Sequence, residues 1–111
     1  MKTTNSGLLS TSGEKMYYWI IYDISETKTR NTVVKLCKNY GLLMVQKSAF
    51  LGILSKNKAE MLASEIKDVI DYERKDVAFL IPACLNCMRD KTIVGFLDEE
   101  RVRDRDFYLV E

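Results

Sequence analysis

The sequence predicts an α+β fold: a single ferredoxin-like domain with one antiparallel sheet, two helices on one face of it, and extra C-terminal strands. Two observations predict this class. Apolar runs rich in β-branched and aromatic residues alternate with two amphipathic helical stretches in the order β-α-β-β-α-β, which is the ferredoxin-like motif. The chain has 111 residues, of which 47% are apolar and 30% charged, and this length allows one modest core but not two.

The chain is expected to divide into three segments. Residues 1–15 are rich in Thr, Ser, Asn and Gly and lack the apolar core of a signal peptide, so we expect a disordered leader or an added extension. Residues 16–97 should form the ferredoxin-like domain, and residues 98–111 a C-terminal extension with one strand. The lack of a signal peptide and of a membrane span, together with three cysteines in no disulfide pattern, favours a reducing, cytoplasmic location.

The first strand, over Tyr17–Tyr22, is aromatic or β-branched without a break, which is typical of a strand buried on both faces. It ends at Asp23, and Ser25 is expected to cap the helix that follows. A lone carboxylate at the end of a strand is costly unless it is hydrated, paired or bound to a metal. Position alone leaves two interpretations of Asp23 open, a solvent-facing turn residue and a functional acid.

Helical spacing of apolar residues predicts two helices. The first should run over Glu26–Tyr40 and end at Gly41, which fits a left-handed terminus, and the second should be capped by Ser55 and reach Asp71. The remaining expected segments are the strands Leu42–Val45, Ala49–Leu54, Val77–Ile81 (closed by Pro82), Thr92–Phe96 and Phe107–Val110, the charged connections Tyr72–Asp76 and Asp98–Asp106, and the loop Cys84–Arg89.

Positive charge is concentrated in one part of the chain. Between Ile24 and Lys58, seven basic residues stand against a single acid, Glu26. This asymmetry indicates a basic face that meets phosphates, although two merely solvated helices explain it equally well. The basic residues are Lys28, Arg30, Lys35, Lys38, Lys47, Lys56 and Lys58.

Several common chemistries are excluded or weakened by the composition. The chain has no histidine, which excludes hydrolase triads built on that residue, and its five scattered glycines form no phosphate-binding loop. Cys84 and Cys87 form a CxxC pair, but one pair supplies two ligands where a structural zinc needs four, unless a dimer brings two pairs together. Redox chemistry needs an activated thiolate, and no helix N-terminus is evident there. Ordinary loop thiols are the favoured interpretation, with Cys37 in the core.

Several short motifs occur in order and at fixed spacing over roughly Tyr17–Phe96. They are Tyr22-Asp23-Ile24-Ser25, Arg30-Asn31, Tyr40-Gly41-Leu42, the run from Val45 to Gly52, Ile81-Pro82 and Ile93-Val94-Gly95-Phe96. Taken together, these motifs resemble the CRISPR-associated protein two family.

The resemblance implies a homodimer of facing sheets, in which the C-terminal strand of each chain crosses to its partner. It implies a role in CRISPR adaptation, an antiviral defence in which the dimer bridges two dimers of the Cas-one integrase and holds the incoming DNA. Several members of the family are described as metal-dependent endonucleases on RNA or double-stranded DNA.

The resemblance also implies roles for particular residues. Asp23 matches the strand-end acid that holds Mg²⁺ (or Mn²⁺) between the two copies of the dimer. Tyr22, Arg30 and Phe50 match positions tied to activity: Arg30 could fork onto a phosphate, while Phe50 either positions a nucleotide or only packs. The further residues expected to contact nucleic acid are Lys28, Lys35, Lys38 and Lys47.

The chain departs from the family pattern at a few positions. Many relatives carry basic residues where this chain has Thr32 and Met44, whereas Lys47 stands where an aromatic residue is frequent. These departures favour a nucleic-acid-binding scaffold over a nuclease, because phosphate affinity can be spread over many lysines but catalytic geometry cannot. A third class stays open, a ferredoxin-like ribonuclease toxin or regulatory module related by fold only.

Overall fold

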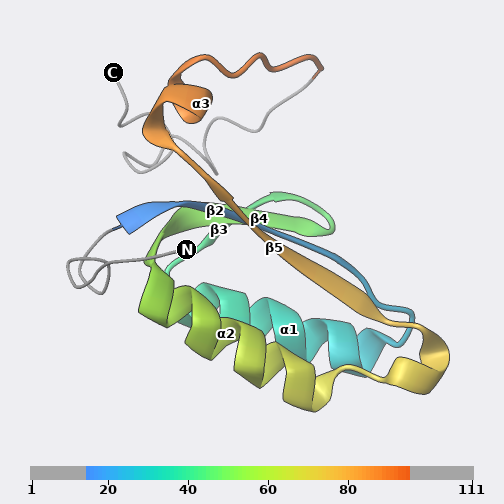
Figure 1. Ribbon diagram of the computed structural model, residues 1–111. Helices are drawn as coiled ribbons and strands as arrows, with labels where there is room; N and C mark the ends of the chain where they lie inside the picture. The colour runs from blue at the N-terminus through green and yellow to red at the C-terminus, as the bar shows by residue number, and fades with distance from the viewer. Residues whose placement is uncertain (1–14, 96–111) are drawn as a thin grey trace.

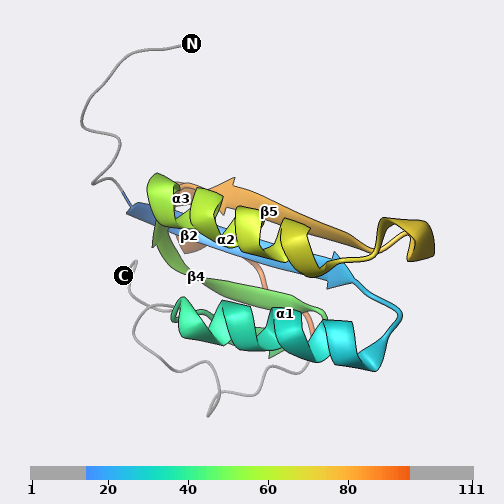
Figure 2. The same cartoon turned by 90° about the horizontal axis from the view of Figure 1, so that it is seen from below.

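The computed structural model describes residues 15–95, in which two long helices pack against one four-stranded antiparallel sheet (Figure 1). The strands are β2 (Lys15–Asp23), β3 (Leu43–Gln46), β4 (Ala49–Ser55) and β5 (Val77–Ala83), in the spatial order β3-β4-β2-β5. The helices α1 (Thr27–Asn39) and α2 (Lys56–Val69) lie side by side on one face of the sheet (Figure 2). This arrangement confirms the predicted ferredoxin-like fold. Within residues 15–95, no helix is long and apolar enough to cross a membrane.

The main core lies between the sheet and these two helices. Because side chains alternate along a strand, every second residue of β2 points to the helices. Tyr18, Ile20 and Tyr22 do so, and each is at most 7% exposed. They share one cluster with Val33 of α1 and Leu62 of α2, which are fully buried. Burial of each such side chain stabilises the fold by about 1.5–3 kcal/mol.

Within residues 15–95, the opposite face of the sheet, which we call the open face, is covered only at one end. There the short helix α3 (Leu85–Arg89) places Met88 against Tyr17 and Leu51, on the side away from α1 and α2 (Figure 1). Toward the other end of β2, Ile21 is 38% exposed. The prediction that the first strand is buried on both faces is therefore wrong for the second half of β2, because the helices cover only one face.

The two predicted helix caps have different outcomes. The Ser55 hydroxyl caps α2 by accepting a hydrogen bond from the backbone N–H of Lys58 at 3.1 Å, as predicted. Ser25 does not cap α1: the residue before this helix is Glu26, whose side chain makes no capping hydrogen bond. The backbone N–H of Ser25 instead donates to the carboxylate of Asp76.

The segment after α2 differs most from the prediction. The connection contains a 3-10 turn, η2 (Tyr72–Arg74), and β5 then runs through Pro82 to Ala83 rather than stopping before the proline. An edge strand tolerates proline because half of its N–H groups have no neighbouring strand to bond, and β5 lies at the edge of the sheet. The predicted loop after it contains the helix α3.

The predictions for the two ends of the chain are tested only in part. Lys15, assigned to the leader, is the first residue of β2. Residues 92–95 are the described part of the predicted strand Thr92–Phe96, and they form no strand. Their backbone is irregular, and Gly95 has a φ of +105°. Residues 1–14, the connection Asp98–Asp106 and the strand Phe107–Val110 lie outside the described residues.

Gly52 is expected to tolerate no side chain. A Cβ at this position would lie 2.6 Å from Cδ2 and 3.2 Å from Cα of Leu42, a residue that is itself only 4% exposed. We expect Gly52→Ala to lower the free energy of unfolding by about 1–3 kcal/mol, the usual cost of overpacking a core, in urea denaturation. The penalty should be smaller in a Leu42→Ala background, which lacks the nearest clashing atom, and an equal penalty there would contradict this explanation.

Candidate functional site

Asp23 is the last residue of β2 and lies at the rim of the open face. It pairs with Val77 of β5 and is exposed, whereas its neighbour Tyr22 points into the core. The alternation along β2 therefore places the Asp23 carboxylate on the same side of the sheet as Tyr17 and Ile21. In a single chain, Asp23 is a hydrated acid beside an apolar surface.

Arg30 holds the loop that follows Asp23. Its Nη1 donates to the carbonyl oxygen of Ile24 at 2.8 Å and to that of Ser25 at 3.4 Å, and its Nη2 donates to the hydroxyl of Thr27 at 3.1 Å. Three contacts thus use a large part of the five N–H donors of a guanidinium. Only the remaining donors are available for the predicted phosphate contact, so Arg30 has a structural role that the sequence did not indicate.

Tyr22 and Phe50 are both buried on the helix side of the sheet. Their rings stack with centroids 6.3 Å apart, and the Tyr22 hydroxyl donates to the carbonyl oxygen of Lys47 at 3.0 Å. Burial raises the pKa of Tyr22 above its ordinary value. Of the two roles expected for Phe50, this geometry favours packing, because Phe50 has no exposed surface to offer a nucleotide. Together the two rings fix the β3–β4 turn next to the end of β2.

The predicted basic residues divide into two groups. Lys28, Lys35 and Lys38 are exposed on α1, on the side of the helix turned away from the buried residues Val33 and Cys37. They therefore lie on the outer surface of the helix layer, not on the open face with Asp23. Lys47 is different: it is exposed in the β3–β4 turn, whose backbone is bonded to Tyr22, the residue before Asp23.

Asp76 is a buried acid that the sequence analysis missed. It is 6% exposed and lies immediately before β5. Its Oδ1 accepts a hydrogen bond from the N–H of Ser25 at 3.3 Å, and its Oδ2 accepts one from the N–H of Asp71 at 3.0 Å. Asp76 thereby ties the loop after Asp23 to the loop after α2. In the sequence, Asp76 is one of several charged residues in the predicted connection Tyr72–Asp76. Nothing in that pattern indicates that it is buried.

The acids that the structure describes do not form a complete metal site within one chain. Among residues 15–95, no group of three or more His, Cys, Asp or Glu side chains lies close enough to hold a metal ion. Asp23 by itself supplies one carboxylate. Its oxygens suit Mg²⁺ when further oxygen ligands come from water, phosphate or a second carboxylate. The donor chemistry therefore fits a shared or substrate-completed magnesium site better than a site within one chain.

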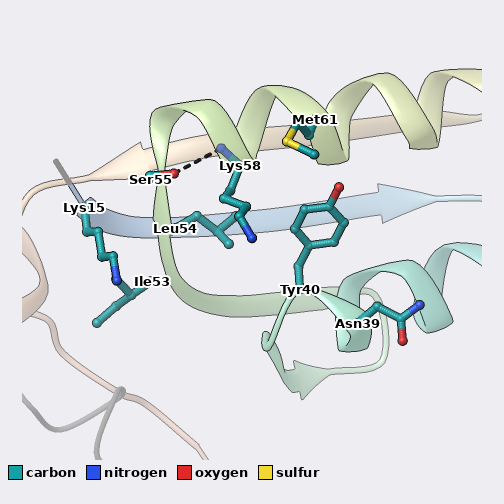
Figure 3. Close-up of a pocket in the computed structure, with 8 residues that line it drawn as sticks. All are labelled: Lys15, Asn39, Tyr40, Ile53, Leu54, Ser55, Lys58 and Met61. Atoms are coloured by element: carbon teal, nitrogen blue, oxygen red, sulfur yellow. Dashed lines mark hydrogen bonds between the residues drawn. The ribbon is translucent and has the colours of Figure 1, made fainter. Parts of the chain in front are cut away.

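A hollow of about 360 Å³ lies elsewhere on the molecule, at the beginning of β2 (Figure 3). Lys15 lines it at one end of β2, whereas Asp23 is the residue at the other end. The lining residues are Lys15, Asn39, Tyr40, Ile53, Leu54, Ser55, Lys58 and Met61. The described lining residues include no carboxylate, so they give no indication of metal-dependent chemistry in this hollow.

Comparisons with known proteins point to one family. The family described as CRISPR associated protein Cas2 matches residues 16–91. A protein of Archaeoglobus fulgidus named CRISPR-associated endoribonuclease Cas2 1 is 33% identical over 90 residues, which cover 81% of this chain and 95% of that protein.

Two further comparisons concern structure and gene organisation. A solved crystal structure of cas2 superposes with a TM-score of 0.64 at 29% identity, covering 76% of this chain and 91% of that one. A Thermoproteus tenax protein named CRISPR-associated endonuclease Cas1/endonuclease Cas2 fusion is 32% identical over 63 residues, which are 57% of this chain and 24% of that longer protein.

Replacement of the buried acid should destabilise the loop at the site. We expect Asp76→Ala to lower the free energy of unfolding by about 1–3 kcal/mol for each backbone N–H that loses its acceptor in a buried position. Thermal or urea denaturation measures this loss. Asp68→Ala, which removes an exposed acid from α2, is the matched control and should change stability by less than about 0.5 kcal/mol. Equal stability of the two variants would show that Asp76 does not hold the loop.

Proposed function

The chain belongs to the Cas2 family of CRISPR-associated proteins, and on this basis we propose that it acts in CRISPR adaptation as a homodimer that binds nucleic acid. In this proposal the two open faces pack against each other, and the pair of Asp23 carboxylates at the rim holds a divalent metal. Metal-dependent hydrolysis of phosphodiester bonds is the second and dependent part of the proposal.

The observation that carries the dimer is the exposed apolar surface of the open face. The exposed fractions are 38% for Ile21, 36% for Val77, 53% for Phe79 and 44% for Ile81. In the sheet Phe79 is opposite Ile21, and Val77 is opposite Asp23, so these side chains form one continuous patch beside the acid. A contiguous apolar patch of this kind usually marks a protein interface.

A two-fold dimer through this patch would complete the metal site. A self-complementary interface repeats each residue across its axis, so a second Asp23 comes from the same rim of the second copy. Two carboxylates with water and phosphate oxygens suit Mg²⁺ or Mn²⁺. When bound, such an ion would polarise a phosphate and lower the pKa of a bound water. Arg30 and Asp76 would keep the Asp23 loop in place while the ion binds.

Nucleic-acid binding is supported by the positive charge near Asp23 and on α1. Lys47 lies in the turn next to the end of β2, where it could contact a phosphate close to Asp23, and the donors of Arg30 that remain free could do the same. Lys28, Lys35 and Lys38 would contribute a longer-range attraction, which is sensitive to salt and independent of sequence. The relatives' endoribonuclease names support activity on RNA, whereas a two-fold dimer with basic residues on both copies would suit double-stranded DNA.

An integrase is the proposed protein partner. The Thermoproteus tenax relative is named as a fusion of Cas1 and Cas2, and proteins that are fused in one organism often associate as separate chains in another. The dimer would bridge two integrase dimers because its two-fold symmetry presents the same surface twice.

Disruption of the open face should abolish both the dimer and its function. We expect Phe79→Glu to raise the dimer dissociation constant by at least about 100-fold, since two charges enter an apolar interface, as measured by sedimentation equilibrium. The same variant should fail to support integration of a labelled duplex by the integrase. Met61→Glu, on the exposed side of α2 with a similar exposure of 46%, is the control and should keep both properties. A dimeric Phe79→Glu chain would refute the proposed interface.

Removal of the rim carboxylate should separate binding from cleavage. We expect Asp23→Asn to bind a DNA duplex within about threefold of the wild type at fixed salt, because phosphate affinity resides mainly in the basic residues. Cleavage in Mg²⁺ or Mn²⁺ should fall by at least about 100-fold, because the amide is a poor metal ligand. Glu26→Gln, an exposed acid three residues away, controls for the change in charge. Undiminished cleavage by Asp23→Asn would exclude Asp23 as the metal ligand.

A further inference from the structure

Two thiols are held in contact at the beginning of α3. The sulfur atoms of Cys84 and Cys87 are 3.2 Å apart, and both residues are exposed. The backbone N–H of Cys87 also donates to Sγ of Cys84, at 3.3 Å. The third cysteine, Cys37, is fully buried on α1. The chain therefore offers solvent one pair of adjacent thiols and keeps its other thiol inaccessible.

The local backbone explains why the sulfurs meet. Cys84 is the residue before α3 and has extended φ and ψ angles of −72° and 165°, so its side chain turns back over the first turn of the helix. Cys87 is the third helical residue, whose backbone N–H this side chain reaches. A loop, which the sequence predicted here, would not hold the two sulfur atoms at 3.2 Å. For this reason the sequence favoured ordinary loop thiols. A disulfide bond needs sulfur atoms about 2.05 Å apart, so a small side-chain rotation would join the pair.

The two thiols differ in acidity. The hydrogen bond between them lowers the pKa of Cys84, because it stabilises the Cys84 thiolate, and raises the pKa of Cys87, whose proton it engages. Burial raises the pKa of Cys37 to about 12, so this thiol stays protonated. Since the thiolate is the nucleophile, Cys84 is the residue of the three that reacts first.

We propose that Cys84 and Cys87 are a reversible redox pair, which closes to an intramolecular disulfide by exchange with a small-molecule disulfide such as oxidised glutathione. The Cys84 thiolate attacks one sulfur of the small disulfide, whose S–S bond breaks and releases one thiolate. The Cys87 thiol then attacks the Cys84 sulfur of the mixed disulfide, releases the second small molecule as a thiolate and gives up its proton to the first thiolate. The proton that Cys84 lost to solvent on ionisation protonates the second. Two protein thiols are oxidised and one small disulfide is reduced to two thiols.

The position of the pair gives the reaction a structural consequence. Cys84 directly follows β5, and Met88, one residue after Cys87, is 3% exposed and packs against Tyr17 and Leu51 at the covered end of the open face. Closure of the disulfide would restrain the first turn of α3 and the exit of the chain from the sheet. The proposal does not depend on the metal or the nucleic acid of the proposed function.

The test uses the full chain, oxidised glutathione and intact-mass spectrometry after alkylation under denaturing conditions. We expect the wild type to lose the mass of two hydrogen atoms and to keep a single alkylatable cysteine, which peptide mapping should identify as Cys37. Cys87→Ser should stop at a stable mixed disulfide on Cys84, because the resolving thiol is gone. Cys84→Ser should react at least about tenfold more slowly. Cys37→Ala should also lose the mass of two hydrogen atoms, and it should keep no alkylatable cysteine.

Several results would overturn the proposal. Three alkylatable cysteines after prolonged exposure, stable glutathione adducts on the wild type, or disulfides between chains would each show that the pair does not close. Stoichiometric binding of Zn²⁺ that keeps both thiols reduced would assign the pair to a metal site instead, since two chains could supply four sulfur ligands.

Discussion

The unequal covering of the two faces of the sheet underlies most of the molecule's other features. In the part of the chain that the structure describes, the strands carry apolar side chains on both faces. The two long helices cover one face, and α3 reaches only the end of the other. Apolar surface left in water costs about 25 cal/mol per Å², so covering a patch that includes Phe79 and Ile81, which are 53% and 44% exposed, would favour the dimer that we propose. Asp23 lies at the rim of that patch. The interface that we propose would therefore run directly beside this acid.

The rim acid is positioned by contacts that leave its own side chain unused. Arg30 donates hydrogen bonds to the carbonyl oxygens of Ile24 and Ser25, and Asp76 accepts one from the backbone N–H of Ser25. Backbone groups on both sides of the loop are therefore satisfied by side chains from α1 and from the start of β5. These contacts involve the loop after Asp23 and not its side chain. The Asp23 carboxylate can therefore bind a ligand without first losing contacts with the protein. This arrangement is what a metal or phosphate site at a strand end requires.

The sequence predicted the fold well and the site unevenly, for physical reasons. Hydrophobic periodicity and the residues at element boundaries predicted β2, both long helices and the hairpin. Each of these depends on local sequence, as the Ser55 cap of α2 shows. The sequence failed where tertiary position decides. Pro82 continues β5 because that strand is at the edge, and a single turn of helix places Cys84 against Cys87. Asp23 is predicted as a site residue from its position at a strand end and from family motifs, and that role stays a prediction. The burial of Asp76 depends instead on a contact with Ser25, 51 residues away in the sequence.

The distribution of positive charge favours holding a duplex over cutting it. Lys28, Lys35 and Lys38 lie on the outer surface of α1, on the side of the sheet opposite to the open face. Thr32 lies on the same exposed side of α1 and donates its hydroxyl hydrogen to the Lys28 carbonyl, while Met44 packs against the core. Neither position supplies the cation found in many relatives. Of the residues predicted to bind phosphate, Lys47 lies in the turn bonded to Tyr22, and Arg30 is already engaged by the loop after Asp23. Attraction of phosphates survives such dispersal because it sums over distance, but stabilisation of a reacting phosphate does not, since it needs cations within a few ångströms.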